Sequence, residues 1–182
     1  KSKMKKTCTT ILVATALTLS AHSMGGETYY GAGLAHLDIP IDGIDDEMLD
    51  ATVTSLHGLV GTRFNENFSG EIRLGIGISD DNNLDDDGFN LKLKNYFGVY
   101  AKAGAQISEI IYPYVVAGYT RGKMEASALG DSESASEGDV SFGVGVDFSI
   151  SKTTKLNLEY MNYLDKDGVE LSGCGLGFSK AL

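Results

Sequence analysis

Residues 140–150 have the sequence VSFGVGVDFSI, in which apolar side chains alternate with small or charged ones. Every second position is valine, phenylalanine or isoleucine, and the positions between them hold serine, glycine and Asp147. A strict period of two is typical of a β-strand, because successive side chains point to opposite faces. The stretch therefore predicts a strand with one apolar face and one face of small and charged residues.

Seven more segments have strand character. The alternation recurs in residues 72–78, 91–100 and 156–161, although Asn95 interrupts the apolar face of the second. Residues 29–37, 55–64, 110–121 and 168–178 are rich in β-branched and aromatic residues and have turn residues on either side. No long segment has a helical period with capping residues. We therefore predict an all-β protein of eight strands.

The connections between these strands alternate in length, except that the fourth connection at the long-loop end is short. Long polar segments occupy residues 38–51, 79–88 and 122–139, whereas residues 65–69, 103–109, 151–153 and 165–167 are short. Long loops at one end and tight turns at the other are typical of barrels that span an outer membrane, with the loops outside and the turns in the periplasm. The pattern predicts an eight-stranded antiparallel up-and-down transmembrane β-barrel.

The alternative is a soluble β-sandwich or lipocalin-like barrel, whose apolar face would point inward. The opposite face would then carry Gly75, Gly77, Gly143 and Gly145 into solvent, where glycines weaken strands without benefit. A narrow eight-stranded lumen instead needs small residues and can pair charges. This comparison favours the membrane barrel.

The N-terminal residues have the features of an export signal. Lys5 and Lys6 precede an apolar run at residues 11–19, and Ala21 with Ser23 supplies the small-x-small pattern of a cleavage site. The alternative, an N-terminal membrane anchor, is disfavoured because the run is far shorter than the roughly 20 residues of a spanning helix. We predict a signal peptide at residues 1–23, in which residues 1–3 are an upstream extension before Met4, and a barrel domain at residues 24–182.

Cleavage at that point would leave an acidic chain with one cysteine, Cys174. Four lysines would leave with the signal, so 11 basic residues would face 25 acidic ones, a net charge of −14. One thiol allows no internal disulfide. A strongly acidic chain also excludes nucleic acid as a partner, because phosphate binding needs a basic surface.

Three stretches resemble the small outer-membrane β-barrel family, which includes the OmpA transmembrane domain and OmpX-like and opacity-like proteins. They are PYVVAGYT at residues 113–120, SFGVGVDF at residues 141–148 and GLGFS at residues 175–179. The resemblance covers the whole mature chain. It implies a location in the bacterial outer membrane, contact with lipid and lipopolysaccharide, and insertion by the barrel assembly machinery. The resemblance predicts the architecture of the protein well and its function poorly.

This chain departs from the family at its end and in its aromatic residues. Family members usually end in an aromatic residue that the assembly machinery recognises, whereas here Lys180, Ala181 and Leu182 come last. Either Phe178 with Leu182 substitutes, or the true terminus differs. The chain has no tryptophan, so an aromatic girdle at the periplasmic interface would use other residues, unless these are in ordinary strand packing: Phe64, Phe68, Tyr112, Tyr114 and Phe148.

Acidic residues are concentrated in the three long loops. Clustered carboxylates suit Ca²⁺ or Mg²⁺, either between loops or as a bridge to anionic lipopolysaccharide, and no other cofactor is indicated. The alternative is a solvated, repulsive surface without bound metal. The candidate residues are Asp45, Asp46, Asp80, Asp81, Asp85, Asp86, Asp87, Glu133 and Glu137.

A second set of charged residues falls on the polar faces of the strands and is expected in the lumen. Either these charges line a gated narrow pore or they pair into a plug that satisfies buried charge, and the small interior of an eight-stranded barrel favours the plug. The predicted cluster is Glu71, Arg73, Asp147, Lys155 and Glu159, joined by Lys92, Lys94 and Lys102.

These features predict a non-enzymatic surface barrel that supports envelope integrity and, through its acidic loops, adhesion to a surface ligand. One alternative is a narrow, low-conductance pore. Another is a lipid-A-modifying barrel enzyme, for which His36, Ser79 and Asp80 could meet as a triad at the outer strand ends. No sequence motif supports the triad.

Overall fold

The computed structural model describes residues 26–41, 49–79, 89–128, 131–166 and 169–182. The predicted signal peptide lies outside these residues. Within them, no helix is long and apolar enough to cross a membrane.

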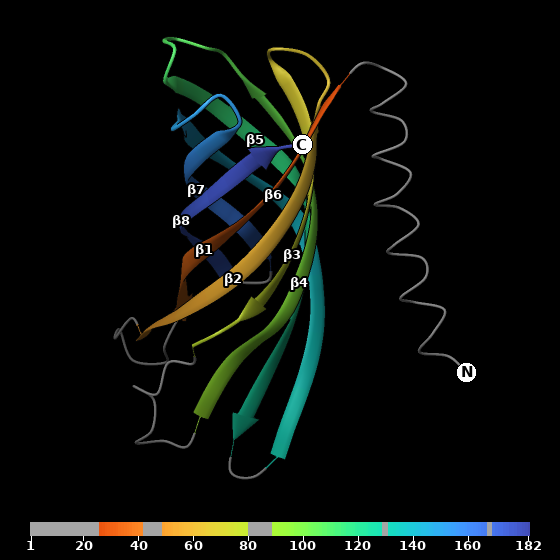
Figure 1. Ribbon diagram of the computed structural model, residues 1–182. Helices are drawn as coiled ribbons and strands as arrows, with labels where there is room; N and C mark the ends of the chain where they lie inside the picture. Colours follow the sequence, from red (N-terminus) through yellow and green to blue (C-terminus); the bar gives the residue numbers. More distant parts are fainter. Residues whose placement is uncertain (1–25, 42–48, 80–88, 129–130, 167–168) are drawn as a thin grey trace, which may run out of the picture.

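Eight antiparallel strands form a closed barrel in which each strand pairs with its neighbour in the chain and β1 pairs with β8 (Figure 1). This confirms the predicted fold. Within the closed part of the barrel each strand has a hydrogen-bonded neighbour on both sides, so its backbone groups have partners. The strands are β1 (Glu27–Ile41), β2 (Leu49–Arg63), β3 (Phe68–Gly77), β4 (Phe89–Gly104), β5 (Ile111–Ala128), β6 (Asp131–Ser149), β7 (Thr154–Lys166) and β8 (Val169–Ala181).

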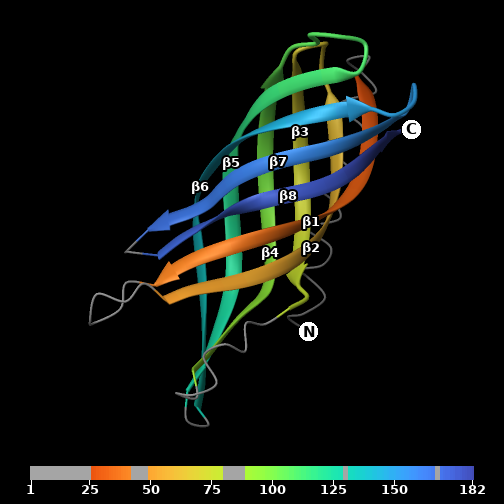
Figure 2. The ribbon, with the colours of Figure 1, turned by 90° about the vertical axis from the view of Figure 1, so that its left-hand side faces the viewer.

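The strands at the long-loop end are longer than the sequence predicts. The expected loop at residues 122–139 is wrong, because β5 and β6 continue to pair from Gly122↔Glu137 up to Ala128↔Asp131. Serine, alanine and glutamate there are weak strand formers, but an antiparallel ladder satisfies their backbone groups. As a result β5 and β6, with the first part of β4 paired beside them, project well beyond β1, β2, β7 and β8 (Figure 2).

The three tight turns at the opposite end are each held by one short polar side chain. Asn65 Oδ1 accepts hydrogen bonds from the backbone N–H groups of Asn67 and Phe68, both at 2.9 Å. Ser108 Oγ and Ser151 Oγ accept in the same way from backbone N–H groups two and three residues later. Asparagine and serine favour turns for this reason.

Apolar side chains cover the outside of the barrel. Ile76, Val115 and Phe142 are each more than half exposed, at 52%, 57% and 56%. We call this outward band the apolar belt; its other members include Leu56, Val60, Leu74, Val99, Tyr119, Val140, Val144, Leu158 and Leu176. A soluble barrel would bury these residues, so the outward apolar face rules out that alternative.

The predicted aromatic girdle is only partly correct. Phe64 and Phe68 are exposed on the outside at the turn end, and Phe148 is half-buried. Tyr114, however, is 4% exposed and lies in the lumen. Tyr112 has the same strand phase, and its hydroxyl donates to the backbone oxygens of Glu66 and Asn67 at the barrel mouth. Both tyrosines therefore do not belong to the girdle. The outward face of β5 carries Val115, and Tyr112 and Tyr114 have the opposite phase.

Candidate functional site

The centre of the lumen is crossed by a buried ion pair network around Arg73. Arg73 Nε and Nη2 donate to Glu71 Oε2 at 2.9 and 2.7 Å. The same guanidinium pairs with both carboxylate oxygens of Glu159, with Nη2 to Oε2 at 3.0 Å. Arg73 is 3% exposed. Because β3 and β7 are not neighbours in the barrel, this contact spans the lumen from wall to wall.

Two lysines extend the network toward the turn end. Lys102 Nζ lies 3.1 Å from Glu71 Oε1 and 3.8 Å from Asp147 Oδ1. Lys155 Nζ lies 4.0 Å from Asp147 Oδ2, and Asn157 donates to Asp147 Oδ1 at 2.8 Å. The structure thus places all five residues of the predicted cluster, and Lys102, in the interior. Three cations face three carboxylates, so the network is neutral as a whole.

Tyrosines complete this layer, and sequence reasoning did not assign them to it. The Tyr114 hydroxyl donates to Glu159 Oε2 at 2.8 Å, and Lys102 Nζ lies 3.7 Å from the centre of the Tyr114 ring. The Arg73 guanidinium carbon lies 4.7 Å from the centre of the Tyr100 ring. Tyr29 donates to Glu71 Oε1 at 2.9 Å. A cation over an aromatic face gains electrostatic energy, most of all where water is excluded.

Glycines on neighbouring strands make room for these rings. A Cβ added at Gly75 would overlap the Tyr96 ring, and one at Gly145 would overlap Tyr114. A Cβ added at Gly61 would likewise overlap the Tyr29 ring, and one added at Gly118 would overlap the Tyr100 ring. An inward tyrosine beside a glycine on the adjacent strand is the sequence signal that could have placed these aromatic residues in the lumen.

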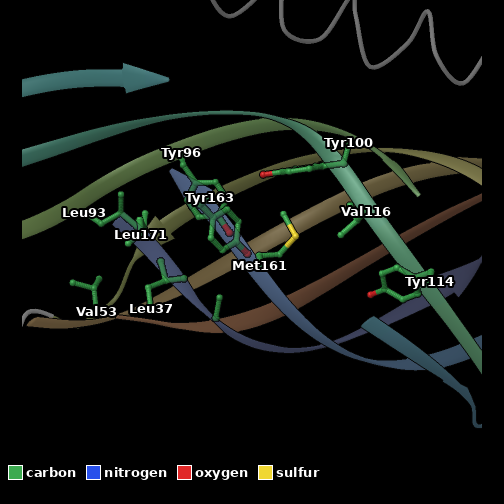
Figure 3. Packing of buried hydrophobic residues seen from close by; sticks show 11 residues of the cluster. Leu37, Val53, Leu93, Tyr96, Tyr100, Tyr114, Val116, Met161, Tyr163 and Leu171 are labelled. Carbon is green, nitrogen blue, oxygen red and sulfur yellow. The ribbon is translucent and has the colours of Figure 1, made fainter. Parts of the chain in front are cut away.

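A second, apolar layer closes the lumen on the loop side of the charged network. Leu37, Val53, Leu93 and Leu171 lie near the loop ends of their strands and gather in the interior, next to Tyr96 and Tyr163 (Figure 3). Each of the four is at most 7% exposed. Sequence reasoning missed this layer, and it put Leu93 on the outward face.

A β-bulge in β4 explains the error at Leu93 and a second one at Lys94. Leu93 pairs with Met124 and Asn95 with Lys123, so Lys94 is an extra residue. The bulge turns Leu93 inward and Lys94 outward, where Lys94 pairs with Glu125. The prediction that Lys94 faces the lumen is therefore wrong, because a bulge reverses the alternation of side chains. The side chain of Lys92 lies outside the described residues.

Most of the predicted acidic cluster cannot be placed. Glu133 belongs to β6, but its side chain is not described, and Glu137 is exposed near the projecting end of the barrel. Among the described side chains, no group of three or more His, Cys, Asp or Glu residues could hold a metal ion. Asp45, Asp46, Asp80, Asp81, Asp85, Asp86 and Asp87 lie outside the described residues.

The histidine and serine of the proposed triad are both exposed, and each contacts Thr54 instead of the other. His36 Nδ1 lies 3.3 Å from Thr54 Oγ1, and the Thr54 N–H donates to Ser79 Oγ at 3.0 Å. In the described part of the chain no hydrogen bond joins His36 to Ser79, and Asp80 lies outside it. Without an imidazole beside the hydroxyl, the described geometry does not activate Ser79 as a nucleophile.

Comparison with known proteins agrees with this architecture. No curated protein matches the sequence. Ail, the attachment invasion locus protein of Yersinia pestis, is 20% identical, with a TM-score of 0.63 over 86% of this chain and 99% of that one. Neisserial surface protein A is 17% identical, with a TM-score of 0.59 over 85% and 97%. The N-terminal β-barrel domain of Pseudomonas aeruginosa OprF is 12% identical, with a TM-score of 0.54 over 82% and 96%.

At these identities the solved structures show a common fold. The family assignment comes from the sequence itself, because the model of the outer membrane protein beta-barrel domain matches residues 9–179. That match covers nearly the whole chain, and the apolar belt and closed barrel are what such a domain needs in a bilayer. The chain therefore belongs to the outer membrane protein beta-barrel family and is located in the bacterial outer membrane.

Proposed function

We propose that the protein is a non-enzymatic, non-conducting surface barrel that supports envelope integrity and presents an acidic extracellular end to a surface ligand. The observation that carries the proposal is the filled lumen. The Arg73 network and the apolar layer of Leu37, Val53, Leu93 and Leu171 lie in series along it. A barrel filled in this way serves as an anchor for what it displays outside.

The filled lumen predicts very low conductance. In planar bilayers the refolded full chain should show no steady conductance steps under conditions in which a large porin, as a control, conducts. Ions would have to pass both a layer of buried apolar side chains and a buried ion pair network, and both oppose the passage of a hydrated ion. Steady, reproducible conductance from the unmodified protein would contradict the proposal and favour the narrow pore.

The acidic end favours a ligand that differs from the one seen with the structural neighbour Ail. Ail has been solved with the heparin analogue sucrose octasulfate. The extended strands and loops of this chain carry many carboxylates, which would repel a sulfated sugar. We infer that the ligand is either cationic or an anionic surface bridged by Ca²⁺ or Mg²⁺, including lipopolysaccharide itself.

Bridging by a divalent ion predicts a change in protease sensitivity. Millimolar Ca²⁺ should slow cleavage around residues 85–87 and 133–139 of the full chain in detergent, and NaCl at matched ionic strength should do less. The Asp85→Asn/Asp86→Asn/Asp87→Asn variant should lose the Ca²⁺ effect, and cells displaying that variant should adhere less well. Lys152→Gln, a change in a tight turn at the other end, is the control.

Equal cleavage with Ca²⁺, with chelator and with NaCl would leave the acidic end as a repulsive surface without a metal. Adhesion that persists in chelator and needs the three aspartates would instead indicate a cationic ligand. Contact with the barrel assembly machinery during insertion follows from family membership and is part of the same proposal. The structure favours this function over a lipid-A-modifying enzyme because His36 and Ser79 are not in contact in the described residues.

A further inference from the structure

Three polar side chains lie in the lumen between the apolar layer and the charged network. Ser55 and His57 follow Val53 along the inward face of β2. Tyr96 follows Leu93 along the inward face of β4. Ser55 is 0% exposed, Tyr96 6% and His57 8%. All three side chains are therefore almost entirely out of contact with bulk water.

The strand register brings these side chains together. His57 pairs with Gly75 on β3, and Gly75 pairs with Tyr96 on β4, so the three residues form one row across three strands. The Tyr96 ring lies over Gly75, because a Cβ added there would come within 2.1 Å of a ring carbon. The centre of this ring is 6.5 Å from the centre of the His57 ring. Ser55 is the inward residue next to His57, so the three polar groups face one small region of the lumen.

Each of these side chains has a buried polar atom without a hydrogen-bond partner among the described residues. The atoms are Ser55 Oγ, His57 Nδ1 and the Tyr96 hydroxyl. The two hydroxyls are near enough to influence each other, but their contact lacks the geometry of a hydrogen bond. The row lies in the middle of the barrel, where all eight strands are described. Buried polar groups that have no protein partner usually have a bound water molecule.

We propose that an ordered water molecule binds between Ser55, His57 and Tyr96 and links β2 to β4 inside the lumen. A buried water typically makes about three hydrogen bonds. Here it accepts from the Tyr96 O–H and donates to Ser55 Oγ and His57 Nδ1, which gives each of the three atoms a partner. The bound molecule has to be small, because the apolar layer and the Arg73 network close the lumen on both sides.

Water fits this site better than an ion does. The three groups are two hydroxyls and an imidazole, and none of them carries a fixed charge. The charges of the neighbouring network are already balanced, with Arg73, Lys102 and Lys155 facing three carboxylates. An ion in the site would therefore be a buried charge without a counter-charge, which is strongly unfavourable. A neutral molecule that both donates and accepts hydrogen bonds avoids this penalty.

The test compares two pairs of inward hydroxyls that β4 shares with another strand. The Tyr96 and Ser55 hydroxyls have no protein partner, whereas the Tyr100 hydroxyl lies 2.6 Å from Thr120 Oγ1. Magnetic relaxation dispersion of the solvent counts long-lived internal waters in the refolded full chain in detergent. Ser55→Ala/Tyr96→Phe should lose one such water per barrel, because His57 alone cannot hold it. The matched control Tyr100→Phe/Thr120→Val should lose none.

Stability gives a second readout, in which the sign of the change decides. If the water is bound, Tyr96→Phe should lower the midpoint of urea unfolding in lipid vesicles, because a satisfied hydroxyl is lost. If the hydroxyl is unpaired, the same change should raise the midpoint, because a buried polar group without a partner is removed. The proposal therefore predicts a lower midpoint for Tyr96→Phe.

Four results would overturn the proposal. These are an unchanged number of long-lived waters in Ser55→Ala/Tyr96→Phe, an equal loss in the control, a raised midpoint in Tyr96→Phe, and a midpoint of the unmodified chain that depends on chloride at constant ionic strength. The last would indicate a bound anion. If the double variant does not refold, Tyr96→Phe alone takes its place in both measurements. None of these results bears on the conductance or on the acidic end, so this proposal and the proposed function fail separately.

Discussion

Replacing Arg73 with methionine is expected to lower the free energy of unfolding by about 3–5 kcal/mol, the usual effect of removing one partner from a buried ion pair. Methionine keeps most of the volume but leaves Glu71 and Glu159 facing each other in the lumen. Lys102 contacts Glu71, and Tyr114 donates to Glu159, but neither replaces a guanidinium that touches both carboxylates. Equilibrium urea unfolding in lipid vesicles measures the change.

Two further variants separate the buried charge from a general effect of losing an arginine. Arg63→Met breaks the ion pair with Glu27, whose side chains are 31% and 47% exposed, and should change stability by at most about 1 kcal/mol. Arg73→Met/Glu159→Gln removes one charge of each sign and should recover at least half of the loss, because Glu71 keeps Lys102 as its partner and the network is neutral again. If Arg73→Met and Arg63→Met lose the same stability, the network does not stabilise the barrel.

Gly145→Val is expected to lower the free energy of unfolding by about 3 kcal/mol. An added Cβ would overlap the Tyr114 ring and approach the Leu158 carbonyl oxygen to 2.9 Å. Forcing extra atoms into a packed interior usually costs about 1–3 kcal/mol. Displacing Tyr114 would also remove its hydrogen bond to Glu159, worth roughly 1.5–3 kcal/mol for a bond to a charged group. The expected figure is below the sum because the ring can shift in part.

Gly58→Val is the matched control for this change. Gly58 also lies in a strand, but its side faces outward, and an added Cβ would meet only the Gly31 carbonyl oxygen, at 3.9 Å. Valine should be neutral or stabilising there, because it favours strands and adds to the apolar belt. Urea unfolding of the two variants, side by side, gives the comparison. If both variants lose the same stability, the loss comes from replacing a glycine in a strand. It does not then come from the contact between Gly145 and the Tyr114 ring.

Where the sequence prediction failed, the cause was a contact with another strand, which the pattern within one strand does not contain. The alternation of side chains in residues 91–100 is ambiguous around Asn95, and only pairing with Met124 and Lys123 shows that Lys94 is the extra residue. Tyr114 could face either way by composition, since both faces of β5 contain apolar residues. Its inward direction depends on Gly145 and Glu159, which come from β6 and β7.

The sequence by itself determined the number of strands, the outward direction of the apolar belt and the inward position of the five charged residues from Glu71 to Glu159. These follow from the period of two, which is local and can be seen within one strand. Only the tertiary structure decided the length of β5 and β6, the bulge at Lys94, the apolar layer around Leu37 and the tyrosine–glycine contacts. Each of these depends on register between strands, and register is a non-local property set by pairing and packing across the barrel.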